Sequence, residues 1–136
     1  MKWMLTATVA AALLLGASAQ AGSSTTLTIR HQVLGCHAWS VNGGPYKATQ
    51  VAQIRRGSTI KLTNNDAMPH KLIKTSGPSI IGHGLNMNHM MSTASVKFTH
   101  AGVYIFKTKA GEDYKGMHMP PTKGKDNVLK LTVTVR

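Results

Sequence analysis

Residues 129–135 read Leu-Lys-Leu-Thr-Val-Thr-Val, so apolar and polar side chains alternate at every position. A period of two is typical of a β-strand that buries one face and exposes the other. Similar alternation recurs at 27–33, 58–63, 94–98 and 103–108. Together with shorter runs near Ile54 and His70, these stretches predict an all-β sandwich of about seven strands.

The first 21 residues have a different character. Lys2 precedes an apolar run from Leu5 to Leu15, and the small residues of 17–21 follow it. A charged start, a short apolar run and an A-x-A-like site are typical of a secretory signal peptide. An apolar run of about 11 residues is too short to span a bilayer. We therefore expect residues 1–21 to be a cleaved leader and residues 22–136 to form one domain, located in the periplasm or secreted.

The chain is strongly basic, with 16 Lys and Arg against four Asp and Glu. Removal of the leader takes Lys2 away and leaves a net charge of +11. Such a charge attracts acidic proteins, anionic lipid or nucleic acid. We expect no nucleic-acid partner for an exported chain that has no basic helix and no base-stacking strand. Alternatively, the Lys and Arg side chains only solvate the outer sheet faces, so the charge alone does not decide a partner.

Cys36 is the only cysteine, which excludes an intramolecular disulfide. In an oxidising compartment, a single thiol is a liability unless it is buried, joined to another chain or bound to a ligand. Its neighbour is His37. Cysteine and histidine are both copper ligands, whereas an inert buried thiol is the alternative interpretation.

The order of the strands predicts that three segments lie at one pole of the sandwich. If the first strand runs up and hairpin neighbours alternate, the strands ending at Thr63 and Thr108 also run up. The segments that follow these strands are Cys36-His37, Asn64–His70 and Lys109–Met119. Residues 75–93 then form a long connection back to this pole, which is a Greek-key crossing.

Two short segments carry the motifs of a known family. Asn64-Asn-Asp-Ala-Met-Pro-His70 resembles the plastocyanin segment that presents the first copper-binding histidine from a turn after a strand. Gly102-Val-Tyr-Ile-Phe106 is similar to the G-x-Y-x-F strand that precedes the copper-binding cysteine of cupredoxins. The resemblance to cupredoxins spans roughly residues 25–136. It implies a cupredoxin-like Greek-key β-sandwich with copper at one pole and His70 among its ligands.

The chain departs from the cupredoxins in the loop after the second motif. Where the family has its cysteine and then its histidine, this chain has Thr108 and Gly111, and only Met117 and His118 match the end of the loop. An ordinary type 1 copper site needs a thiolate, two histidines and a weak axial ligand. We therefore predict a thiolate from a different strand and a copper site built from Cys36, His37 and His70, with Met117 or His118.

Other residues leave alternatives open. The Met and His side chains between Gly82 and Met91 form either a second Cu(I) site or core packing. Glu112 and Asp113 provide either a carboxylate ligand or a partner for a nearby lysine. We expect His31 to be a hydrogen-bonded core residue and His100 to be solvated. Trp39 and Tyr46 are expected to shield the copper site.

Three functions compete for this site. The first is copper handling, in which the protein carries, buffers or donates Cu(I), and the second is electron transfer with an acidic partner. The third is a structural or interaction module without metal. The missing loop cysteine and the surplus of soft ligands favour copper handling. Four carboxylates and the absence of G-x-S-x-G or H-E-x-x-H motifs argue against a hydrolytic enzyme. We expect a monomer or a copper-bridged dimer.

Overall fold

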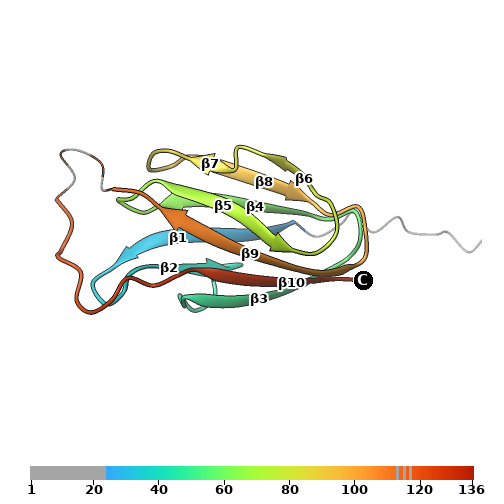
Figure 1. The fold of residues 1–136 in the computed structure, drawn as a ribbon, viewed down its shortest axis with the longest axis horizontal. Coiled ribbons are helices and arrows are strands. Elements are labelled where there is room, and N and C mark those ends of the chain that lie inside the picture. The colour runs from blue at the N-terminus through green and yellow to red at the C-terminus, as the bar shows by residue number, and fades with distance from the viewer. Residues whose placement is uncertain (1–23, 113, 115, 117) are drawn as a thin grey trace, which may run out of the picture.

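The computed structural model describes residues 24–112, 114, 116 and 118–136. This part of the chain forms two five-stranded sheets that pack face to face, as Figure 1 shows. The first sheet has the order β2 (Cys36–Val41), β1 (Thr25–Gln32), β4 (Thr59–Asn65), β8 (Thr93–Lys97) and β6 (Ile81–His83). The second has the order β3 (Thr49–Ile54), β10 (Lys130–Val135), β9 (Gly102–Ala110), β5 (His70–Ser76) and β7 (Asn86–Met87).

The prediction of an all-β sandwich is confirmed. The alternating pattern of residues 129–135 corresponds to β10, which buries Leu131, Val133 and Val135 between the sheets. The described residues contain no helix, and hence none that could span a membrane. The predicted leader, residues 1–21, lies outside the described part of the chain.

Aromatic side chains fill the centre of the space between the sheets. Phe98 meets Tyr104 and Phe106 edge to face, with ring centroids 4.9 and 6.0 Å apart. These rings are buried in one continuous core with Trp39. Trp39 is fully buried in this core, and its indole N–H donates a hydrogen bond to the Ala48 carbonyl. Tyr46 packs under the Arg30 guanidinium instead of against the predicted site.

Two parallel strand pairs determine which loops share a pole. β1 runs parallel to β4 and β3 runs parallel to β10, whereas the other neighbours are antiparallel. The hairpin from β1 to β2, the turn from β4 to β5 and the connection from β9 to β10 therefore meet at one end. This end is on the left of Figure 1, where the orange and red connection projects. The predicted common pole is confirmed.

Two details of the predicted strand pattern were wrong. Cys36 and His37 were expected in a loop, but they begin β2. Nearly all of β2 is buried on both faces, so its sequence shows no alternation. Residues 75–93 were expected to form one long connection without strands of its own, yet they contain β6 and β7. Strands of three and two residues are too short to produce a periodic pattern.

Candidate metal centre

The β1–β2 hairpin places Cys36 and His37 at the pole. Gly35 and Cys36 both have left-handed backbone conformations, with φ of 78° and 64°. The connection between β9 and β10 holds this turn from outside, because Gly35 N–H donates to the Lys123 carbonyl and Asn127 N–H donates to the Gly35 carbonyl. The Asn127 side chain also donates to the His37 carbonyl over 3.1 Å. These bonds fix the start of β2.

Asn64 organises the turn that carries the second half of the site. Its side-chain amide donates to the carbonyl oxygens of Met68 and Met87, over 2.9 and 3.2 Å. Its side-chain oxygen accepts the backbone N–H of Asp66 over 3.0 Å. A buried Asn that bonds to its own turn stabilises a compact local conformation. Asp66 and His70 are thereby brought onto the same side of the turn.

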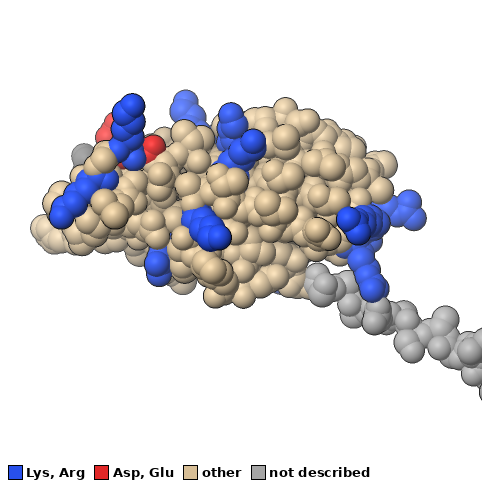
Figure 2. Space-filling model, turned by 90° about the horizontal axis from the view of Figure 1, so that it is seen from below, with Lys and Arg blue, Asp and Glu red and all other residues tan. Residues whose placement is uncertain are grey.

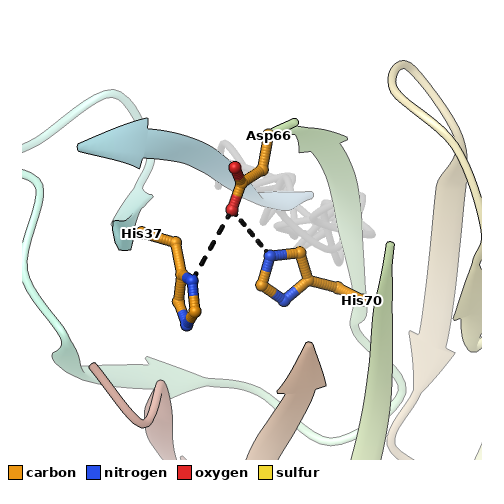
Figure 3. Close-up of side chains that lie close together, drawn as sticks. All are labelled: His37, Asp66 and His70. Atoms are coloured by element: carbon orange, nitrogen blue, oxygen red, sulfur yellow. Dashed lines mark hydrogen bonds and ion pairs between the residues drawn. The ribbon is translucent and has the colours of Figure 1, made fainter. Parts of the chain in front are cut away.

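His37, Asp66 and His70 form a buried cluster, shown in Figure 3. His70 Nε2 lies 2.7 Å from Asp66 Oδ2, and His37 Nδ1 lies 3.8 Å from the same oxygen. The imidazole rings of His37 and His70 meet edge to face, with centroids 4.8 Å apart. His37 comes from β2 of the first sheet and His70 from β5 of the second. The cluster therefore spans both sheets.

The Asp66 carboxylate fixes the tautomer of His70. An ionised carboxylate only accepts hydrogen bonds, so His70 Nε2 carries the proton that is donated to it. His70 Nδ1 then has a lone pair, and this atom is buried without a hydrogen-bond partner among the described residues. A carboxylate that orients a histidine in this way is common behind metal-binding imidazoles. Figure 3 shows that the second nitrogens of the His37 and His70 rings both point away from Asp66.

His31 is a third imidazole beside Asp66. Its Nδ1 lies 3.9 Å from Asp66 Oδ1, and its Nε2 lies 3.0 Å from the Pro120 carbonyl oxygen. The expected hydrogen bond of His31 is present, but the expectation of a core residue was wrong, because His31 is half-buried at the pole and lies outside the core cluster. His100 is exposed, as expected. His31 therefore lies on the Asp66 side of the cluster.

Burial lowers the pKa of His37 below its usual value of 6.5. The neighbouring His70 lowers this pKa further, whereas Asp66 partly raises it. Burial disfavours the charged form of an imidazole because it removes the solvating water. His37 is therefore neutral at pH 7, which is the form that binds metals.

Two sulfur atoms meet on the segments that carry the histidine cluster, although Cys36 is not among the residues whose ligand atoms lie within 4.8 Å of one another. Cys36 Sγ is 3.2 Å from Met68 Sδ, and Cys36 itself is buried. Thr108, for which the resemblance implied the position of a cysteine, lies on β9 with its side chain pointing into the sandwich. Thr108 Oγ1 is buried and has no hydrogen-bond partner among the described residues. The Thr108 hydroxyl therefore belongs to the second sheet, whereas the Cys36 thiol belongs to the first.

The other predicted site residues are not brought together with the histidine cluster by the described part of the chain. His118 is exposed, and within the described chain no contact joins it to His37 or His70. Met117 and Asp113 lie outside the described residues, and Glu112 is exposed. The loop of 82–91 is also divided: Met87 is fully buried in the core opposite His70, whereas Met91 is exposed. Met87 is therefore a packing residue, which resolves that alternative for this methionine.

Sequence reasoning missed Asp66, which belongs to the cluster, and Met68, whose Sδ lies 3.2 Å from Cys36 Sγ. Both lie inside the segment that delivers His70, so a sequence signal was available. Asp66 is one of only four acidic residues and is four positions before the histidine. Acidic residues are scarce in this basic chain, so an aspartate close to the predicted ligand His70 indicated a role at the site.

Comparison with known proteins gives the following results. The sequence matches no family profile and no curated protein. A Cu(I) form of an amicyanin variant aligns with 19% identity and a TM-score of 0.40, over 67% of this chain and 72% of amicyanin. A purple cupredoxin from Nitrosopumilus maritimus aligns with 16% identity and a TM-score of 0.43, over 82% of this chain and 98% of its own. The chain is similar to these proteins in fold alone.

Proposed function

We propose that this chain is an exported copper-binding protein that carries or donates copper and does not catalyse a reaction. The observation that carries the proposal is the buried pair His37 and His70. His70 Nδ1 is buried without a hydrogen-bond partner in the described part of the chain, and the second nitrogen of His37, Nε2, also points away from Asp66. Buried polar atoms are normally bonded. A bound cation at this cluster accounts for such atoms, and imidazole suits copper in both oxidation states.

The sulfur atoms of Cys36 and Met68 determine which oxidation state of copper this site favours. Thiolate and thioether are soft ligands that prefer Cu(I). We propose Cys36, His37 and His70 as ligands, with Met68 as the nearest further sulfur. When bound, copper supplies a one-electron couple. The protein's part is to hold the His37 imidazole neutral, to orient His70 through Asp66 and to keep the centre away from water.

A copper titration tests this proposal. The mature protein is titrated with Cu(I) under anaerobic conditions and with Cu(II) in air, and binding is followed by native mass spectrometry and optical absorption. We expect one tightly bound copper per chain and a thiolate-to-Cu(II) charge-transfer band. Cys36→Ser should abolish this band without unfolding the domain. An unchanged spectrum would exclude the thiolate from the site.

A matched pair of histidine variants controls for surface binding. His70→Ala should weaken copper binding far more than His100→Ala. His100 is exposed and lies in the turn from β8 to β9, at the end of the sandwich opposite the cluster. Equal losses would show that copper binds adventitiously to surface imidazoles. A native protein that retains no copper at equimolar concentration would instead favour the metal-free module.

Copper handling and electron transfer differ in how readily the ion leaves. We expect strong preference for Cu(I) and rapid transfer of the ion to a competing Cu(I) chelator. Slow transfer, combined with fast reversible one-electron voltammetry, would favour electron transfer. The exposed Met91 and half-buried Met90 test the handover route. Their replacement by Leu should slow transfer if they receive Cu(I).

A further inference from the structure

A hollow of about 340 Å³ lies on the surface beside the metal centre. It is bounded by β5, β7 and β9, which run side by side in the second sheet. His70 is one of the residues that line it, and the polar side chains around it are Lys71, Lys109, Asn86 and Asn88. This hollow therefore combines closeness to His70 with hydrogen-bond donors and positive charge.

The strand register aligns three of these donors. Lys71 on β5 is directly opposite Asn86 on β7 and also directly opposite Lys109 on β9. Residues paired across neighbouring strands project to the same face of a sheet. All three side chains are exposed. We call Asn86, Lys71 and Lys109 the donor row.

The donor row places two positive charges, those of Lys71 and Lys109, side by side with no described carboxylate paired to them. Lys71 and Lys109 are cross-strand partners, and Lys107 and Lys130 form a second such pair nearby. Like charges directly opposite each other in a sheet are destabilising. The ion pairs formed in the described part of the chain are those of Asp66 with histidines, so no described carboxylate neutralises these lysines. Figure 2 shows the same imbalance on one face, where blue side chains are widespread and red ones gather at one end.

We propose that the donor row and its hollow dock the carboxylates of an acidic partner protein. Two ammonium groups and a side-chain amide match an Asp or Glu side chain that protrudes into the hollow. The concave shape suits such a side chain better than the flat headgroup layer of a membrane. Charge complementarity of this kind increases the rate of encounter and sets the orientation of the partner. The partner is thereby brought close to His70; its part in copper transfer rests on the proposed function, whereas carboxylate docking does not.

A titration with an acidic peptide tests the docking site. The probe is hexaglutamate, added to the metal-free protein at low ionic strength and followed by ¹⁵N NMR and calorimetry. We expect chemical-shift changes concentrated at the donor row and binding that weakens as salt is added. The double variant Lys71→Gln with Lys109→Gln should bind roughly five- to tenfold more weakly, as expected for the loss of two exposed ion pairs.

The matched control is Lys61→Gln with Lys97→Gln. Both lysines are exposed on the first sheet, and the double replacement removes the same charge. This control should bind the peptide nearly as well as the native protein. Equal weakening in both double variants would overturn the proposal, because net charge alone would then explain binding. Absence of peptide binding, or tighter binding to anionic lipid vesicles through the same lysines, would also overturn it.

A charge reversal provides a second readout. Lys71→Glu converts the repulsion with Lys109 into an attraction, so it should raise the unfolding temperature while weakening peptide binding. A lysine that only solvates the sheet would leave peptide binding unchanged. Copper titration of the same variants separates the two proposals. Peptide docking in a protein that binds no copper would leave the docking site intact and overturn only the proposed function.

Discussion

Asp66 is fully buried, whereas Glu112 and Asp126, the other described carboxylates, are exposed. Burial of a charge is costly unless it is paired and hydrogen-bonded. Asp66 is paired with His70 and lies near His31 and His37. A bound copper ion would add positive charge to the same cluster. The position of this carboxylate is therefore best explained by the histidines that it orients.

Replacement of Asp66 by Asn tests this role. An amide can donate as well as accept, so it no longer requires the proton of His70 to be on Nε2. We expect copper affinity to fall roughly 10- to 100-fold, the usual loss for a group that orients a metal-binding histidine. Competition with a chelator measures the affinity, and ¹⁵N NMR of the imidazole measures the tautomer. Asp126→Asn is the control; if it lowers the affinity equally, Asp66 has no special role.

His37 makes the metal-free protein sensitive to acid. Its pKa is lower in the folded state than the ordinary 6.5, so the unfolded chain takes up a proton first as the pH falls. The contribution of His37 to stability is complete above pH 6.5, and it declines below that pH until the folded state is also protonated. The slope is at most about 1.4 kcal/mol per pH unit for one proton.

Urea unfolding of the metal-free protein at several pH values between 5 and 7.5 measures this effect. His37→Gln should remove part of the decline below pH 6.5, because the substituted side chain does not titrate. His100→Gln, at an exposed position, should leave the decline unchanged. Identical pH profiles for the native protein and His37→Gln would contradict the lowered pKa.

At the scale of elements, the β1–β2 hairpin depends on Gly35. A Cβ at this position would lie 2.2 Å from the Nδ2 atom of Asn127, and φ is in the left-handed region. The same Asn127 amide bonds to the His37 carbonyl. A side chain at residue 35 would therefore displace the group that holds the start of β2.

We expect Gly35→Ala to destabilise the fold more than Gly43→Ala. Gly43 also has a positive φ, but nothing lies within 4 Å of a Cβ placed there. The Gly43 variant should lose about 1 kcal/mol through backbone strain alone. The Gly35 variant should lose at least about 1 kcal/mol more, since a hydrogen bond is also disrupted. Chemical denaturation measures both, and only Gly35→Ala should weaken copper binding.

The sequence predicted those elements that have one exposed face. Alternation identified β10 and β4, and the direction of the strands placed Cys36, His37 and His70 at one pole. Alternation failed to identify β2, because this strand is buried on both faces. It also failed for Asp66 and Met68, because their positions depend on the turn conformation that Asn64 stabilises. Periodicity records which face of a strand is buried, but it holds no information on side-chain contacts within a turn.

At the scale of the whole molecule, the cluster connects the two sheets. His37 belongs to the first sheet and His70 to the second, so a shared ion would cross-link them. A ligand that binds only the folded state stabilises it by about 2.7 kcal/mol at 100 times its dissociation constant. For a domain of this size we expect the unfolding temperature to rise by roughly 10 °C.

Calorimetry with increasing Cu(I) concentration measures this shift. The unfolding temperature should continue to rise after one equivalent has been added, as mass action requires. His70→Ala should show almost no rise, whereas His100→Ala should behave like the native protein. A rise that persists in His70→Ala would place the stabilising copper elsewhere on the chain.

The position of β10 affects the chain before folding is complete. This strand is synthesised after β3 and β9, yet it lies between them in the sheet. Until it arrives, both neighbours have unpaired backbone edges, which are templates for association with other chains. Pairing of distant segments is also slow. During this interval the thiol of Cys36 is not yet enclosed by the sandwich, so oxidation and aggregation compete with folding in the newly made protein.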